Sequence, residues 1–165
     1  MSHRLYIGNK MTEIPYFNAP WFDKAERSLL AIPTVIQTFN PAEHDRNMGF
    51  NPMLCPHGSK EESRAAGFNV REALSADWEW IAKYSTGMVV GQDWMSSPGA
   101  KSEVACHHAL GLPVWEYANF LKYWNSPLLW TPELMVKPMR PVFALAPPEP
   151  AEDPDDGGFF CDCHS

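Results

Sequence analysis

The chain has 165 residues, enough for one domain with a buried core, and its formal net charge is −7 at neutral pH. A hydrophobic fraction of 45% and an aromatic fraction of 13% are typical of a folded globular protein. The acidic balance argues against general binding to a nucleic-acid backbone, whereas a small phosphorylated ligand needs only local donors. No apolar run reaches membrane-spanning length and no signal segment opens the chain, so we expect a cytoplasmic protein without a membrane partner.

Four cysteines occur in a chain for which we expect no secretion, so free thiols or a metal site fit them better than a disulfide framework. Cys55 and His57 form one suggestive pair, and Cys161, Cys163 and His164 lie together near the other end of the sequence. Their spacing is not that of a standard zinc motif. We therefore predict that the protein holds neither a metal nor another cofactor.

The first part of the chain predicts a strand, a helix and a second strand. The first strand covers 4–7 and ends at Gly8, and a helix follows over about 20–31 with Asn18 as its cap. A β-branched strand then covers 34–39. This order predicts parallel strands joined by a right-handed crossover.

The segment 46–69 has no clear period and is long for a connection inside a compact domain, so we interpret it as an inserted loop or lid. Residues 70–84 then predict a helix. Its apolar face is expected to hold four residues at helical spacing: Val70, Leu74, Trp78 and Ile81. Asp77 falls at the border of that face, where an acid is less expected than on a solvated surface.

A second unit of strand, polar turn, helix and strand follows. The strand covers 88–90, the helix covers about 100–110, and the next strand starts at Leu112. The helix N-terminus thus lies at the carboxyl end of a buried strand, where free N–H groups and the helix dipole attract anions. Ser97 and Gly99 add a hydroxyl group and allow close approach of a ligand to the backbone.

Three strand ends are expected to meet in one crevice of such a sheet. They bring Tyr6 with the Gly8 loop, Asn40 with the residues after it, and the turn that leads to Glu103. Asp77 enters from the preceding helix. The sequence therefore predicts two acids beside an anion-binding turn.

Each of these residues also has a plain structural interpretation. Tyr6 fits simple packing, Ser97 fits a helix cap, and Glu103 fits an acid near a helix start that the dipole favours. Asp77 fits a cap for a neighbouring loop. Taken one at a time, these positions leave the functional and the structural interpretations open.

Four motifs occur in order along the chain: Tyr6-Ile-Gly-Asn-Lys-Met-Thr12, Phe39-Asn-Pro-Ala-Glu-His-Asp45, Ala73-Leu-Ser-Ala-Asp-Trp-Glu-Trp-Ile81 and the stretch from Asp93 to Glu103. Together they resemble the nucleoside 2-deoxyribosyltransferase-like superfamily, most closely its small phage and bacterial members. The resemblance covers about 4–117 and leaves 46–69 unmatched. The family's usual Gly-Pro after the first strand is replaced here by Asn9-Lys10.

The resemblance implies a doubly wound α/β fold and cleavage of the N-glycosidic bond of a 2′-deoxynucleoside 5′-monophosphate. It implies that Glu103 is the nucleophile, that Asp77 binds the sugar or protonates the leaving base, and that Tyr6 belongs to the catalytic set. Ser97 matches the serine that serves the 5′-phosphate. The full binding set that we carry over is Gly8, Met11, Asn40, Ser97 and Gly99.

These residue types suit that chemistry, because breaking the C1′–N bond builds positive charge on the sugar and negative charge on the base. A carboxylate against C1′ can form a covalent glycosyl intermediate, and a second acid can hold the proton for the base. We expect the helix N-terminus to lower the pKa of Glu103, and Asp77 to be the less solvated acid. The acceptor, water or a second base, stays open, and so does a non-catalytic nucleotide sensor on the same fold.

Composition also suggests how the chain is organised. We expect residues 1–124 to form the α/β domain and 125–165 to form a Pro-rich extension, partly disordered or packed on a neighbouring subunit. Seven tryptophans and this extension predict a homodimer or higher oligomer with the crevice near the interface.

Overall fold

A computed structural model describes residues 2–138 of the chain. Four strands form one sheet in the order β2-β1-β3-β4. The strands are β1 (His3–Gly8), β2 (Val35–Phe39), β3 (Gly87–Val90) and β4 (Val114–Glu116). Every pairing is parallel, with β3 placed directly beside β1. The predicted parallel sheet is therefore confirmed.

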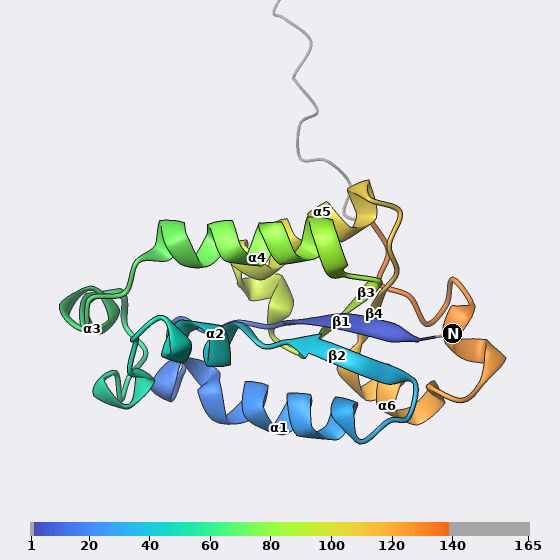
Figure 1. The fold of residues 1–165 in the computed structure, drawn as a ribbon, viewed down its shortest axis with the longest axis horizontal. Coiled ribbons are helices and arrows are strands. Elements are labelled where there is room, and N and C mark those ends of the chain that lie inside the picture. The colour runs from blue at the N-terminus through green and yellow to red at the C-terminus, as the bar shows by residue number, and fades with distance from the viewer. Residues whose placement is uncertain (1, 139–165) are drawn as a thin grey trace, which may run out of the picture.

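Helices cover both faces of this sheet (Figure 1). One face carries α1 (Ala19–Leu30) and α6 (Tyr117–Tyr123), and the other carries α4 (Val70–Tyr84) and α5 (Pro98–Ala109). This is the doubly wound α/β arrangement that the sequence predicts. The shorter elements are α2 (Pro41–Asn47), α3 (Lys60–Ala65), and the 3₁₀ turns η1 (Pro15–Asn18), η2 (Pro52–Leu54), η3 (Trp94–Ser96) and η4 (Pro127–Trp130).

The alternation of side chains along β1 divides the core into two clusters. Leu5 and Ile7 pack with Phe22 on the α1 side, whereas Tyr6 packs with Ile81 on the α4 side. All five side chains are almost fully buried, as expected for a parallel strand covered on both faces. Each large apolar side chain that is buried in this way contributes about 1.5–3 kcal/mol to the hydrophobic stabilisation.

The buried face of α4 differs from the one predicted. Asp77, Trp80 and Ile81 are buried, while Val70 and Trp78 are 54% and 49% exposed. The helical period was right, but the face was wrong by about one residue. The reason is that α4 turns its acid, rather than Trp78, toward the interior.

The connection between β1 and α1 holds an unusual backbone. Glu13, Tyr16, Phe17 and Asn18 all have φ between 53° and 62°, in the left-handed region that costs roughly 1–2 kcal/mol for each non-glycine residue. Asn18 precedes α1 but forms no side-chain cap; its Nδ2 instead donates to the carbonyl of Lys10 at 2.8 Å. The predicted capping role of Asn18 was therefore wrong.

The segment 46–69, expected as an inserted loop or lid, contains η2 and α3 and has a small core of its own. Phe50 and Cys55 are buried against Phe17 of the connection between β1 and α1. Ser59 and Glu62 form a reciprocal capping box that starts α3. In Figure 1 this part lies at the end of the molecule opposite the N-terminus, beyond the carboxyl ends of the strands.

Part of the expected extension packs on the chain itself. Trp115 donates from Nε1 to the carbonyl of Leu129 at 2.8 Å, and the backbone N–H of Val136 donates to the carbonyl of Val114. Leu129 is fully buried in the core on the α1 side. Residues 125–138 therefore extend the domain that we expected to end at 124, and 139–165 lie outside the described residues.

We predict that Gly58→Ala destabilises the protein more than Gly111→Ala. Both glycines have φ of +69°, but a Cβ at Gly58 would meet the backbone of Ile14, including its carbonyl carbon at 2.8 Å, whereas a Cβ at Gly111 meets nothing within 4 Å. Gly111→Ala should cost roughly 1–2 kcal/mol of unfolding free energy. Gly58→Ala should cost at least about 1 kcal/mol more. Urea denaturation measures both, and equal losses would show that the contact at Ile14 is unimportant.

Candidate active site

A cavity of about 430 Å³ lies at the carboxyl ends of β1 and β3. These two strands are neighbours, and the chain leaves them in opposite directions, through α1 to β2 and through α5 to β4. The cavity therefore lies at the topological switch point of the sheet, where open α/β folds have their ligand crevice. Its walls come from both core helix layers and from α2 and α3.

Most of the residues predicted for the site line this cavity. They are Gly8, Met11, Asp77, Ser97, Gly99 and Glu103. Tyr6 lies beneath the wall, fully buried. Asn40 does not line the cavity: its Oδ1 accepts from the N–H groups of Ala42 and Glu43, and its Nδ2 donates to carboxylates of α1. Asn40 thus caps α2 and ties it to α1.

Glu103 and Asp77 are the two acids at the deep end of the cavity, and both are almost completely buried, at 7% and 6% exposed. Gly8 makes room for Glu103, because a Cβ on Gly8 would stand 3.2 Å from its Oε2 and would also strike Met88. Burial, followed by the nearby charge of Asp77, raises the pKa of Glu103 to about 8. Burial raises the pKa of Asp77 to about 7.

The expectation that the helix N-terminus lowers the pKa of Glu103 was wrong. Glu103 is the sixth residue of α5, which starts at Pro98. The dipole effect falls off within the first turn, so desolvation dominates at this depth. The companion expectation, that Asp77 is the less solvated of the two acids, was also wrong, since both carboxyl groups are equally removed from water.

The Tyr6 hydroxyl faces both acids from below the cavity floor. It lies close enough to both carboxyl groups to favour their ionised forms, although it forms no hydrogen bond of regular geometry with the described residues. Burial and the charges of Glu103 and Asp77 raise the pKa of Tyr6 well above its ordinary value. Tyr6 is therefore a neutral donor with two acceptors in reach.

The N-terminus of α5 forms another part of the wall. Ser97 is the N-cap residue, and its Oγ accepts from the N–H of Ala100 at 3.2 Å. The Gly99 N–H is among the first-turn donors without an intrahelical partner and forms no hydrogen bond with residues 2–138. A Cβ at Gly99 would meet only Ser97 Oγ, at 3.8 Å, so the protein itself leaves this side of the backbone open.

His107, one turn after Glu103, is fully buried and has a structural position. Its Nδ1 pairs with the carbonyl of Glu103 and its Nε2 pairs with the hydroxyl of Ser85, both at 2.9 Å. Burial lowers the pKa of His107 to about 4, so the ring is neutral at physiological pH. The helix segment that carries Glu103 is held in place through this ring.

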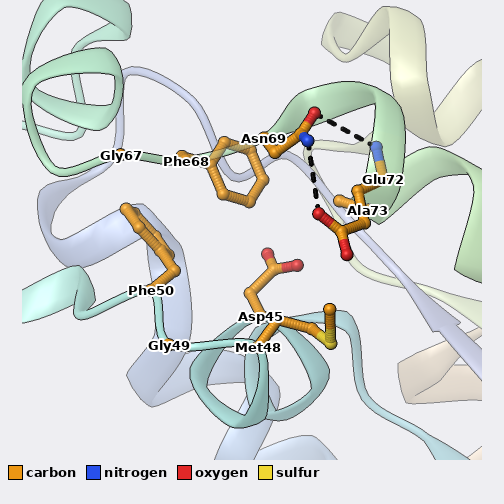
Figure 2. Close-up of a pocket in the computed structure, with 9 residues that line it drawn as sticks. All are labelled: Asp45, Met48, Gly49, Phe50, Gly67, Phe68, Asn69, Glu72 and Ala73. Carbon is orange, nitrogen blue, oxygen red and sulfur yellow. Dashed lines mark hydrogen bonds between the residues drawn. The ribbon is translucent and has the colours of Figure 1, made fainter.

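Sequence reasoning missed three charged residues of the cavity wall: Asp45, Lys60 and Arg64. Asp45 is buried, and desolvation together with the charge of Asp77 raises its pKa to about 7. It also borders a smaller pocket of about 110 Å³, and Figure 2 shows its carboxyl group pointing into that pocket. Two signals in the sequence could have located the helices that carry these residues. They are the helical spacing of Pro41 and Asp45, and the capping signature formed by Ser59 and Glu62.

In residues 2–138, no group of three or more His, Cys, Asp or Glu side chains is arranged to hold a metal ion. None of the helices in the same range is long and apolar enough to cross a membrane. The cysteines and histidine of 161–164 lie outside the described residues.

Comparison with known proteins gave no relative: no family model, no curated protein and no solved structure matches this chain. The structure alone therefore defines the class of this protein. It is a doubly wound parallel α/β domain with acids in the cavity at its topological switch point.

We predict that Glu103→Gln stabilises the protein at alkaline pH. The folded state holds the Glu103 proton up to about pH 8, whereas an unfolded glutamate releases it near its ordinary pKa. Stability is therefore lost as pH rises through this range, and the amide variant avoids the loss, on the order of 4 kcal/mol at pH 8.5. Thermal unfolding of the parent and the variant from pH 5 to 9 measures this difference in stability. Glu79→Gln on the surface should leave the profile unchanged, and a Glu103→Gln profile parallel to the parent's would contradict the prediction.

Proposed function

We propose that the protein cleaves the N-glycosidic bond of a 2′-deoxynucleoside 5′-monophosphate through a covalent intermediate on Glu103. The observation that carries the proposal is the pair of buried acids, Glu103 and Asp77, which face one tyrosine hydroxyl in a cavity that also contains a helix N-terminus. The resemblance of the four sequence motifs to nucleoside 2-deoxyribosyltransferase-like proteins favours the same reaction.

In the first step, the ionised Glu103 attacks C1′ and the C1′–N bond breaks. The bonding electron pair leaves with the base, which takes a proton from Asp77. In the second step, water attacks C1′, its proton passes to Asp77, and the Glu103 carboxylate is released. A second base in place of water would give transfer, and the choice between these acceptors stays open.

The protonation state of the acid pair supports this two-step scheme. The pKa values of about 7 for Asp77 and about 8 for Glu103 mean that the pair holds roughly one proton near neutral pH. One proton is what the reaction needs, since one acid must be ionised and the other protonated. The proposal requires this shared proton to lie on Asp77 when the positive sugar forms beside the ionised Glu103.

The substrate's phosphate is assigned to the N-terminus of α5, at Ser97 and Gly99. The helix rises about 1.5 Å per residue, so Glu103, one turn beyond Gly99, lies within a sugar's reach of a phosphate bound there. Gly8 and Met11 then border the sugar and base. Tyr6 is buried below the cavity and is assigned to positioning the two acids rather than to contact with the substrate.

Two assignments made from the sequence change or stay untested. Asn40 is assigned to holding α2 and not to the substrate, because its side-chain groups are all engaged within the protein. The homo-oligomer stays a prediction.

We predict that Glu103→Gln abolishes base release from 2′-deoxynucleoside 5′-monophosphates. The amide keeps the size of the side chain but is a poor nucleophile, so turnover should fall by roughly three orders of magnitude or more while the nucleotide still binds. Chromatography of released base and titration calorimetry measure the two properties. Glu79→Gln is the matched surface control.

Normal turnover by the Glu103→Gln variant would remove Glu103 from the nucleophile role. An adduct on Asp77, found by mass spectrometry of the quenched parent enzyme, would exchange the roles of the two acids. A parent protein that binds nucleotides but releases no base would favour the sensor interpretation.

We predict that Gly99→Ala separates substrate binding from stability. The free protein has room for the methyl group, and alanine replaces glycine in a helix with a gain of up to about 1 kcal/mol. A phosphate against this backbone has no such room, so KM for monophosphates should rise roughly tenfold while KM for nucleosides stays the same. Unchanged KM for monophosphates would place the phosphate elsewhere in the cavity.

A further inference from the structure

α3 brings two positive charges to a cavity whose other charged residues are acids. Among residues 2–138, Lys60 and Arg64 are the basic residues that line it, and both are exposed to solvent. They are four residues apart on one helix, so their side chains leave from the same face. Ser63 lies beside them on the cavity wall, buried, with its hydroxyl donating to the carbonyl of Lys60.

The described part of the chain holds these two charges in no ion pair. Lys10, Arg46 and Lys83, by contrast, each form one. The causes of the pKa shifts of Asp45, Asp77 and Glu103 include neither of them, so the two cations are not part of the acid cluster. The pKa of the exposed Glu13 is lowered mainly by Lys10, and the charge of Lys60 makes the smallest contribution to that shift.

The position of α3 is fixed by the fold. The N–H of Glu13 donates to the carbonyl of Gly58 at 2.8 Å, and the N–H of Tyr16 donates to the carbonyl of Cys55 at 3.0 Å. Both donors belong to the connection between β1 and α1 with its left-handed residues. Gly58 packs directly on the backbone of Ile14. A strained connection that persists in a protein is held by its surroundings and often marks a functional site.

We propose that Lys60 and Arg64 recognise the phosphate of the substrate together with the N-terminus of α5, which lines the same cavity, and that α3 thereby adds selection for phosphorylated over unphosphorylated nucleosides. The inference rests on the proposed function for the identity of the substrate. Asp45, Asp77 and Glu103 leave the cavity with residual negative charge near neutral pH, which disfavours an entering anion, and Lys60 and Arg64 are the cations among residues 2–138 that line the wall and can compensate it. Arg64 offers a planar fork for two phosphate oxygens, and Lys60 offers a point charge.

The test compares Lys60→Ala, Arg64→Ala and the double variant with the parent, each with a 2′-deoxynucleoside 5′-monophosphate and the matching nucleoside. Each single variant should weaken monophosphate binding roughly tenfold, and the double variant more, while nucleoside binding stays within a factor of two. Arg64→Lys keeps the charge and should recover part of the loss. Lys24→Ala with Arg27→Ala on the exposed surface of α1 is the charge-matched control.

Titration calorimetry is carried out with the parent and all variants in the Glu103→Gln background, which is expected to bind without turnover, so this experiment is independent of the base-release assay. If the parent releases base but the double variant binds monophosphate as well as the parent, the inference about α3 fails and the proposed function stands. Equal losses for monophosphate and nucleoside, or the same loss in the α1 control, would also overturn it. If no base is released, a selective loss of monophosphate binding would still support recognition of the anion by α3.

Discussion

The burial of two carboxyl groups against a tyrosine hydroxyl is the constraint on which the rest of this structure depends. Glu103 and Asp77 come from α5 and α4, and Tyr6 lies on the strand between them and the other layer. Removing a carboxylate from water is costly unless it is paired or neutralised, and here the acids respond by keeping protons near neutral pH. This cost follows from the doubly wound fold, because β1 and β3 bring the helices that carry the acids to one crevice.

Several features outside the acid pair make this arrangement possible. Gly8 ends β1 without a side chain, so that the Glu103 carboxyl group fits against the strand. His107 bonds to the backbone of Glu103 and to Ser85, which fixes α5 against the start of β3. Asn40 stabilises α2, and α2 presents Asp45 to the same cavity. None of these groups needs to touch a substrate to affect what the site does.

The cavity wall carries charged residues of both signs. Asp45, Asp77 and Glu103 are buried acids, whereas α3 contributes the exposed Lys60 and Arg64, which form no ion pair with any described residue. Charges of both signs in one cavity can orient a ligand that has an anionic group and a separate reacting bond. The strain in the connection between β1 and α1 is balanced by its hydrogen bonds to the segment that leads into α3.

The sequence by itself determined the main strands and helices of this fold and six residues of the cavity wall. Short apolar runs mark β1 and β3, and helical spacing and end signals mark α4 and α5, because these signals are local. Parallel order follows from the alternation of strands and helices. The same reasoning placed Asp77, Ser97 and Glu103 at one crevice, since the carboxyl ends of neighbouring parallel strands share an edge of the sheet.

Only the tertiary structure decided the rest, because it depends on contacts between distant segments. The sequence cannot distinguish an Asn40 that binds a ligand from one that caps α2. In the folded protein its Nδ2 donates to two acids of α1, so the side chain is engaged within the protein. The rise in the pKa of Glu103 comes from desolvation by the whole domain, which no local pattern reports. Lys60 and Arg64 reach the cavity because an aperiodic segment folds back onto the connection between β1 and α1, and this long-range packing has no signature in the sequence.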